Sequence, residues 1–363
     1  MSPEQSGSES RDVEPSNPES LTPESHNPST GQIRAQYESA RAEFEKNVEH
    51  ARAQFEKTAE QARVQIEKNV EQARAQFEEV QVLIQKRTGR NLIGAIAVGI
   101  LLGGSLLASL LIDKQLFIFF AIFLLGIASF ELATAMRHRR WYVPRYLSTA
   151  VTVGVVPVAF YWGMVYAVVA ILAGLAIIFV WMLVRLSWWK GVEGATVASS
   201  FAASAFTQGY VTFFGAFTVA LVAQPNGQWW TIAFLIVVVS VDIGAYSSGL
   251  MFGKHLLAPR ISPKKTWEGF AGAGIVASIA GVLVTWLMLH EVWWTGIVLG
   301  LLLLVVATWG DLGESYLKRV IGIKDMSNWL AGHGGFLDRI DSILPSGVVV
   351  YIVYFIVQLL KQG

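Results

Sequence analysis

The chain has 363 residues, of which 53% are hydrophobic and 15% charged, and its mean hydropathy is +0.46. This composition is too apolar for a soluble globular protein and predicts an integral membrane protein. Cysteine is absent, which excludes disulfides, thiolate metal ligands and a cysteine nucleophile, so any chemistry must rest on carboxylates, cations, histidine or serine. The N-terminus has no apolar h-region, so we expect no cleavable signal peptide.

Charge divides the chain near residue 90. Residues 1–90 carry 12 Lys+Arg and 16 Asp+Glu, whereas residues 91–363 carry 16 and 11. Residues 1–32 are rich in Ser, Pro, Glu and Asn and have almost no apolar side chains to offset the entropy of the chain. We therefore expect a disordered tail over residues 1–32.

A repeat of period 11 follows the tail and reads ARAEFEKNVEH, ARAQFEKTAEQ, ARVQIEKNVEQ and ARAQFEEVQVL. Phe44, Phe55, Ile66 and Phe77 recur at this spacing, and smaller apolar residues between them complete a narrow stripe. The period predicts one long helix over residues 33–90, straight or slightly right-handed. Three roles stay open for it: self-association as a coiled coil or homodimer, packing along a partner helix, and lying on a membrane surface.

Residues 91–363 predict a membrane-embedded domain with about nine transmembrane helices, because roughly 20 apolar residues are needed to cross the hydrocarbon core. The predicted spans are 92–112, 116–136, 147–162, 164–184, 196–223, 229–250, 269–289, 293–310 and 343–360. The expected fold class is therefore all-α, a polytopic bundle of membrane helices preceded by the long amphipathic helix.

The basic residues predict the orientation of these spans. With the N-terminus in the cytoplasm, the loops that return to the cytoplasm contain nearly all the Lys and Arg, and the opposite side has only Lys114 and Lys361. This is the positive-inside pattern. We expect a multi-pass protein whose N-terminus and active site are cytoplasmic.

Charged residues concentrate between the last two predicted spans, where five of the 11 acidic residues after position 90 lie within 311–341. Two sets have the spacing of one helical face: Asp311, Ser315 and Lys318, and then Asp338, Asp341 and Ser342. Two converging helices would direct these carboxylates to one point, and Mg²⁺ is held by oxygen ligands of this kind together with phosphate. The alternative is a cytosolic loop whose opposite charges neutralise one another.

A glycine-rich turn, Gly332-His333-Gly334-Gly335, separates the two sets. Glycine lets the backbone approach a ligand closely, and the amides of a helix that begins near Phe336 would face an anion. Taken alone the turn is a weak signal, because ordinary turns also use glycine.

The loop after the sixth span contains a second polar cluster. Ser262, Lys264, Lys265 and Thr266 form a compact set of cations and hydroxyls suited to a polyphosphate. A positive-inside anchor is the alternative for the basic residues.

Two acidic residues lie near the boundaries of predicted spans. Asp242 follows the apolar run IAFLIVVVSV, where an ionisable group is a candidate for function. Glu131, late in the second span, is also a candidate for function. The alternative is a structural role in which its carboxylate is hydrated or paired.

The run S-Y-L-K-R-x4-K-D-M-S-x2-L-A-G-H-G-G-F-L-D-R-I-D, from Ser315 to Asp341, resembles the hallmark of the CDP-diacylglycerol synthases, or phosphatidate cytidylyltransferases. The sequences ISPKKTWEG and D-x-G-A-Y, the latter from Asp242, resemble a second block of that family. The resemblance covers about residues 92–363. One departure is Ala331, which stands where the family usually has Pro or Gly.

The resemblance implies transfer of CMP from CTP to phosphatidate in a bacterial plasma membrane, with Mg²⁺ as cofactor and CDP-diacylglycerol and pyrophosphate as products. The family's metal-binding aspartates match Asp311 and Asp338. The further residues expected to be catalytic are Lys318, Arg319, Lys324, Asp325, His333, Arg339 and Asp341. The residues expected to bind substrate are Asp242, Ser262, Lys264, Lys265, Thr266, Glu268, Ser315, Gly334 and Gly335.

Some alternatives stay open at this point. His333 would either donate to a phosphate oxygen or brace the turn. A CTP-dependent kinase of a polyprenol-type lipid is the nearest other activity, and a transporter or scaffold is the non-enzymatic one. The expected partners are CTP and phosphatidate within the bilayer, with no nucleic acid.

Overall fold

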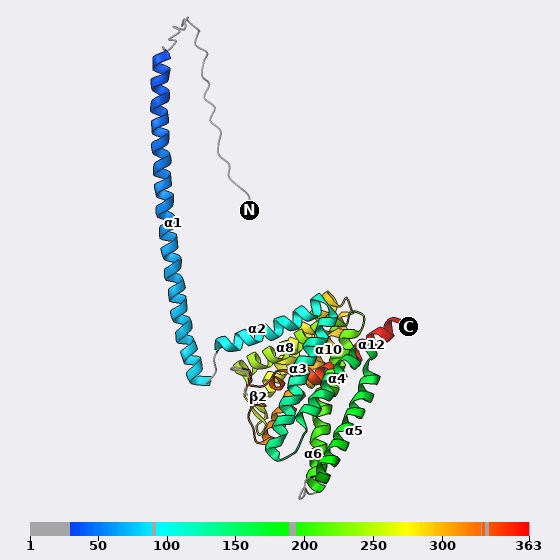
Figure 1. The fold of residues 1–363 in the computed structure, drawn as a ribbon. Helices are drawn as coiled ribbons and strands as arrows, with labels where there is room; N and C mark the ends of the chain where they lie inside the picture. The colour runs from blue at the N-terminus through cyan, green and yellow to red at the C-terminus, as the bar shows by residue number, and fades with distance from the viewer. Residues whose placement is uncertain (1–29, 89–91, 189–193, 328, 331–333, 363) are drawn as a thin grey trace, which may run out of the picture. The chain divides into compact units, whose positions relative to one another are not determined.

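A computed structural model gives the fold of this chain (Figure 1) and describes residues 30–88, 92–188, 194–327, 329–330 and 334–362. The chain separates into two compact units, residues 1–79 and 80–363. The tail expected over residues 1–32 lies outside the described residues except at its end, because the first helix already begins at Thr30.

The long helix expected over residues 33–90 is present as α1, Thr30–Thr88. Its apolar stripe is exposed, and the side chains of Phe44, Phe55 and Ile66 are each more than 60% accessible. Ion pairs along the helix repeat with the period of the sequence: Arg41–Glu45, Arg52–Glu56 and Arg63–Glu67. Exposed pairs of this kind stabilise a helix only slightly, so the stripe is the feature through which α1 can gain packing energy.

The second unit is a bundle of helices. They are α2 (Leu92–Ile112), α3 (Lys114–Ala135), α4 (Arg145–Trp162), α5 (Met164–Trp188), α6 (Gly194–Thr207), α7 (Phe214–Ala223), α8 (Gly227–Phe252), α9 (Trp267–Leu283), α10 (Trp293–Ile321), α11 (Leu337–Ile340) and α12 (Ile343–Gln362). A 3-10 turn, η1 (Met136–Arg139), continues α3, and π-helical turns, η2 (Gln208–Phe213) and η3 (Val284–Met288), continue α6 and α9.

All nine apolar segments expected to be spans form helices. Within the described residues, seven helical stretches are long and apolar enough to cross a membrane. The described apolar part of α2 is shorter, Ala97–Ile112, and α4, which contains Pro157, is not among the seven. The helical membrane fold is thus confirmed, whereas the number nine is not.

Helices α8, α9 and α10 pack closely because small residues face one another. A Cβ atom added at Gly281 of α9 would lie 2.1 Å from the carbonyl oxygen of Gly296 in α10, and one added at Gly300 would lie 2.4 Å from that of Ala277. Small residues allow membrane helices to approach to backbone contact. This packing fixes the ends of three helices relative to one another.

A short hairpin connects α8 to α9, where the sequence predicts only a loop. Its strands are β1 (Leu256–Ala258) and β2 (Ser262–Thr266), paired antiparallel with Leu256 opposite Thr266. The fold is therefore nearly all-α, and the basic cluster lies on strand β2.

The bundle has two apolar cores. One is formed mainly by α3, α4, α5 and α7, and the other by α8, α9, α10 and α12. Leu337 and Ile340 of the short helix α11 are buried in the first core. The segment between α10 and α12 is thereby anchored in the first core.

Candidate active site

A polar cavity of about 280 Å³ brings both motif regions together. Six residues singled out from the sequence line it: Asp242, Ser262, Lys264, Lys265, Thr266 and Asp311. Lys265 on β2 forms an ion pair with Asp311 of α10, and the carboxylate of Asp242 on α8 lies close enough to interact with both charges. The close packing of α8, α9 and α10 is what brings these residues to one place, although they are 23 to 69 positions apart in sequence.

Helix α10 carries its charged residues beyond its apolar part. It continues to Ile321 and ends at Gly322, whose φ of 86° is in the left-handed region that glycine adopts without strain. Asp311 and Ser315 share a face, as their spacing predicts, and the Ser315 hydroxyl donates to Asp311 Oδ1 at 3.4 Å.

Lys318 forms the centre of a second charged group. Its ammonium contacts the carboxylate of Glu314 and lies 2.8 Å from Asp338 Oδ1. The side chains of Lys318 and Glu314 are 15% and 0% exposed. Charges this buried are stable only when they are paired, so Lys318 ties α10 to α11 in addition to any contact with substrate.

The carboxylate of Asp338 holds together the two ends of the loop that precedes α11. Its Oδ2 accepts hydrogen bonds from the backbone N–H of Met326, at 3.1 Å, and of Gly335, at 2.8 Å. Gly334 has a φ of 81°, and a Cβ atom there would lie 2.9 Å from Asp338 Oδ2. The second glycine of the turn is therefore required both by its backbone conformation and by the space that Asp338 occupies.

Glu131 of α3 holds the other side of this loop. Its side chain is 2% exposed and accepts hydrogen bonds from the N–H of Phe336, at 3.1 Å, and of Leu337, at 2.9 Å, and from the Ser327 hydroxyl. The sequence predicts that amides near Phe336 face an anion, and in the structure the anions are carboxylates of the chain itself. Motif spacing did not single out Glu131, and its place inside an apolar span was the only signal for it.

Asp341 follows α11 directly and contacts a different set of groups. Its Oδ1 accepts from the N–H of Ser342 at 2.6 Å, and its charge interacts with that of Asp311. A Cβ atom at Gly310 would lie 2.6 Å from the Asp341 carbonyl oxygen, which shows how closely this turn packs on α10. Tyr210 of η2 is near the same carboxylates, and its buried hydroxyl has no hydrogen-bond partner among the described residues.

Two residues expected to bind substrate have structural contacts. The Thr266 hydroxyl accepts from Gly269 N–H at 3.1 Å and caps α9. Glu268 accepts from the N–H of Lys254, at 3.1 Å, and of His255, at 3.2 Å. Together they hold the hairpin against the start of α9, while Thr266 also lines the polar cavity.

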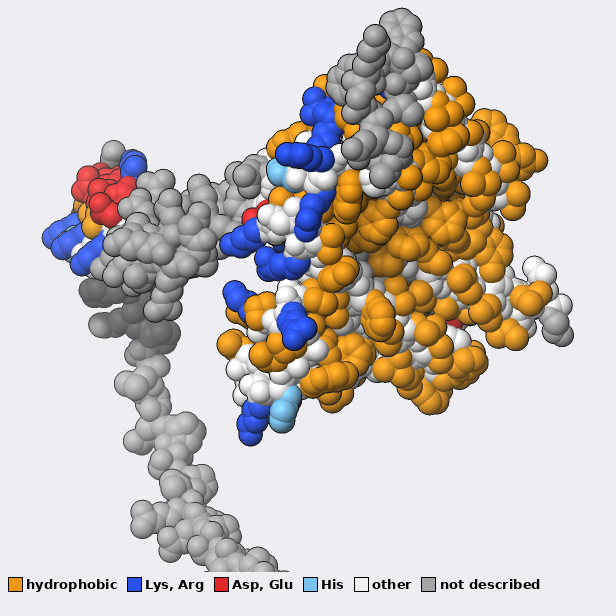
Figure 2. Space-filling model, turned by 90° about the horizontal axis from the view of Figure 1, so that it is seen from below, with side chains coloured by type: hydrophobic (Ala, Val, Ile, Leu, Met, Phe, Trp, Pro, Cys, Tyr) orange, Lys and Arg blue, Asp and Glu red, His pale blue; other side chains and the backbone are white. Residues whose placement is uncertain are grey.

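The remaining expected site residues lie at the end of α10, in the loop that follows it and on α11. Arg319, Lys324 and Arg339 are exposed, and Asp325 is half-buried beside Gly334. His333 lies outside the described residues. Figure 2 shows Lys and Arg side chains gathered along one side of the bundle, whereas most of the rest of the visible face is apolar.

The carboxylates offer hard oxygen ligands but not a complete protein cage for a metal. Across the described ranges there is no group of three or more His, Cys, Asp or Glu residues arranged to hold an ion. Asp311 and Asp338 are each paired with a lysine. Any metal at this site would therefore take part of its coordination from a substrate or from water.

Comparison with known proteins finds several relatives of this chain by sequence. The chain is 36% identical over 278 residues to a phosphatidate cytidylyltransferase of Mycobacterium leprae, an alignment that covers 73% of this chain and 88% of the relative. It is 34% identical over 277 residues to one of Mycobacterium tuberculosis, covering 74% of this chain and 83% of the relative. A phosphatidate cytidylyltransferase of Brucella suis is 40% identical over 167 residues, which is 45% of this chain and 58% of the relative.

A sequence model of the cytidylyltransferase family matches residues 94–357. This range contains the whole described bundle from α3 to α11, both motif regions and every residue of the candidate site. The match leaves out α1 with its period of 11. From residue 94 onward, the chain belongs to the cytidylyltransferase family.

Proposed function

We propose that the chain transfers CMP from CTP to phosphatidate, forming CDP-diacylglycerol and releasing pyrophosphate. The observation that carries this proposal is the ion pair between Lys265 and Asp311 in the polar cavity, because it joins the two motif regions at one point. The names of the relatives support the same reaction, and the apolar helices around the cavity suit a lipid substrate.

The chemistry needs neutralisation of charge more than it needs a base. A phosphatidate oxygen attacks the α-phosphorus of CTP, and the bond from that phosphorus to the pyrophosphate oxygen breaks. Both reactants are polyanions, and a phosphate monoester is already largely ionised near neutral pH. Catalysis therefore rests on positioning and on cations around the phosphates.

The basic residues would contact different phosphate groups, according to where each residue lies. Lys264 and Lys265 line the cavity and would bind the triphosphate. The exposed Arg319, Lys324 and Arg339 would meet the departing pyrophosphate or the lipid phosphate. Lys318 would act mainly by holding Asp338 in place, because its ammonium already lies between two carboxylates.

Mg²⁺ would be held by Asp311 and Asp338. A carboxylate has about four lone-pair sites, and Asp338 uses three of them for Lys318, Met326 and Gly335. Two carboxylates suffice for Mg²⁺, which usually keeps several waters and binds phosphate oxygens as well. When bound, the ion would neutralise phosphate charge.

We place the site on the cytoplasmic side of a bacterial plasma membrane. The basic residues lie along one side of the bundle (Figure 2), and the positive-inside rule assigns such a side to the cytoplasm. CTP is a cytosolic nucleotide, so this orientation gives it direct access to the cavity. For α1 we propose self-association through the exposed stripe of Phe44, Phe55 and Ile66.

The test is an assay of the purified full-length protein with CTP labelled at the α-phosphate, phosphatidate and Mg²⁺. Labelled liponucleotide is the expected product, and both a chelator and the Asp311→Asn change should abolish it while the helical circular dichroism is kept. Label recovered only as CDP would instead identify a CTP-dependent lipid kinase. No turnover with any lipid would overturn the enzymatic proposal.

A further inference from the structure

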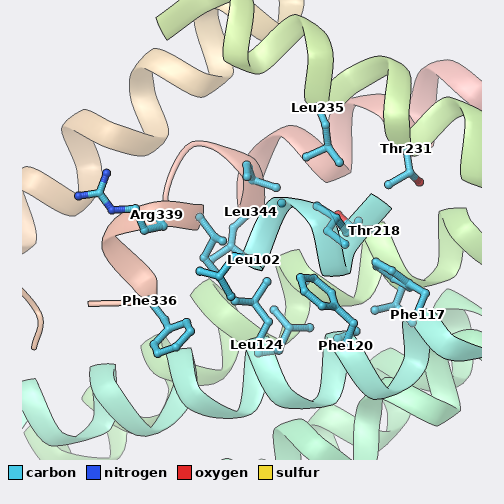
Figure 3. Close-up of a pocket in the computed structure, with 18 of the residues that line it drawn as sticks. Leu102, Phe117, Phe120, Leu124, Thr218, Thr231, Leu235, Phe336, Arg339 and Leu344 are labelled. Carbon is cyan, nitrogen blue, oxygen red and sulfur yellow. The ribbon is translucent and has the colours of Figure 1, made fainter. Parts of the chain in front are cut away.

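A second cavity, of about 220 Å³, lies within the bundle between α2, α3, α7, α8 and the α11–α12 segment (Figure 3). Its walls are almost entirely hydrocarbon, with rings from Phe117 and Phe120 of α3 and Phe234 of α8. Such a lining offers a charged nucleotide almost no hydrogen-bonding or charged partners, whereas burial of a hydrocarbon chain there is favourable. The cavity is distinct from the polar one, since the two share no lining residue.

One end of this cavity belongs to the candidate active site. In Figure 3, Phe336 and Arg339 lie at one end, and Thr231 and Phe117 lie at the other. The stem of Arg339 lines the cavity, while its guanidinium is directed away from the apolar side chains. Long cationic side chains commonly place their charge at an apolar boundary in this way.

The contacts of this end link the cavity to Asp338. Arg339 follows Asp338 in the chain, and Phe336 is held by the hydrogen bond from its N–H to Glu131. The ring of Phe336 also packs edge-on against Phe123, with 5.8 Å between the ring centroids. A molecule in the cavity would therefore have its outer end next to the loop that carries the proposed metal ligand.

We propose that this cavity holds one acyl chain of the phosphatidate substrate, with the lipid phosphate next to Arg339. The inference rests on the function proposed above and adds the lipid subsite to it. A cation at the mouth and hydrocarbon behind it match a lipid with an anionic head group in both charge and polarity. The wall that α3 provides, from Phe117 to Leu125, is about 12 Å long at 1.5 Å per residue.

Helix α2 offers a way to fill the cavity without disturbing the fold. Gly103 lines the cavity, and a Cβ atom added there would have no atom within 4 Å. Gly104, its neighbour in α2, has equally open surroundings but does not line the cavity. Gly103→Leu and Gly104→Leu thus make the same chemical change in the same helix, and only the first places a side chain in the proposed acyl subsite.

The experiment measures kcat/KM of the full-length enzyme for dioleoyl and dihexanoyl phosphatidate in mixed micelles with CTP. For Gly103→Leu we expect the ratio of the dioleoyl to the dihexanoyl value to fall about tenfold, the scale on which a pocket discriminates chains by size. For Gly104→Leu we expect the wild-type ratio. As a second measurement, phosphatidate with a diazirine near the middle of one acyl chain should label peptides of α2 and α3 in the wild type, and less so in Gly103→Leu.

The outcomes separate this inference from the proposed function. Equal ratios in both variants, or labelling confined to helices that do not line the cavity, would overturn the acyl subsite while leaving the activity intact. A wild-type protein that forms no liponucleotide from either lipid would overturn the proposed function, and the photolabelling would then still report whether the cavity takes an acyl chain.

Discussion

The carboxylate of Glu131 in α3 accepts a hydrogen bond of 2.9 Å from the N–H of Leu337 in α11, which is 206 positions away in sequence. The same loop is tied to α10 through Asp338 and Lys318. The segment that carries the strongest sequence motif is therefore held from two sides, by one carboxylate supplied by a distant helix and one within the motif itself.

Replacing Glu131 by Gln should lower kcat/KM by roughly tenfold or more. The amide group would turn one acceptor into a donor facing a backbone N–H, and an unsatisfied buried donor costs about 1–3 kcal/mol. Hydrogen exchange of residues 326–338 should become faster in this variant. Glu291→Gln is the matched control, because Glu291 is similarly buried and paired with Lys361 but precedes the other end of α10. Equal losses in both variants would argue against a specific role for Glu131.

Replacing Lys318 by Met should destabilise the protein by about 3–5 kcal/mol, because it leaves buried carboxylates without their cation. The loss should appear as a lower midpoint in thermal unfolding in detergent. The double change Glu314→Leu with Lys318→Met should recover much of that stability, since it removes a buried charge together with its partner. If the single and double variants unfold at the same temperature, removal of Glu314 does not relieve the loss, which contradicts this prediction.

Replacing Gly334 by Ala should reduce activity sharply. The new Cβ atom would meet Asp338 Oδ2 at 2.9 Å, and the φ of 81° is unfavourable for alanine. Gly313→Ala is the control, because a Cβ atom there has nothing within 4 Å and glycine in a helix interior is about 0.5–1 kcal/mol less favourable than alanine. The control should be as active as the wild type and slightly more stable to heat.

Removal of residues 1–88 should leave the cytidylyltransferase activity in place. The cores and the candidate site consist of residues beyond 91, and the family match begins at residue 94. The deletion should instead lower the mass of the particle seen by light scattering, because the exposed stripe of α1 is then lost. A particle of unchanged mass would contradict self-association through α1, and loss of turnover would show that α1 supports catalysis.

The helices could be predicted from the local pattern of apolar and polar residues in the sequence. Hydropathy and helical spacing are properties of neighbouring residues, so the nine apolar segments and the shared face of Asp311 and Ser315 could be read without the fold. The hairpin could not be read in the same way. The five residues of β2 are largely polar and contain a proline, and they form a strand only because β1 pairs with them.

Composition, hydropathy and motifs were enough to predict a helical membrane protein, the residues that carry its charge and the family whose motifs it contains. The charge partners became apparent only in the folded structure: Lys265 with Asp311, Lys318 with Glu314 and Asp338, and Glu131 with the backbone of the glycine-rich loop. Spacing along the chain does not give the distances between these groups. The energy of a buried charge depends on groups within a few ångströms, and most of these neighbours come from helices that the packing of small residues brings together from far apart in the chain.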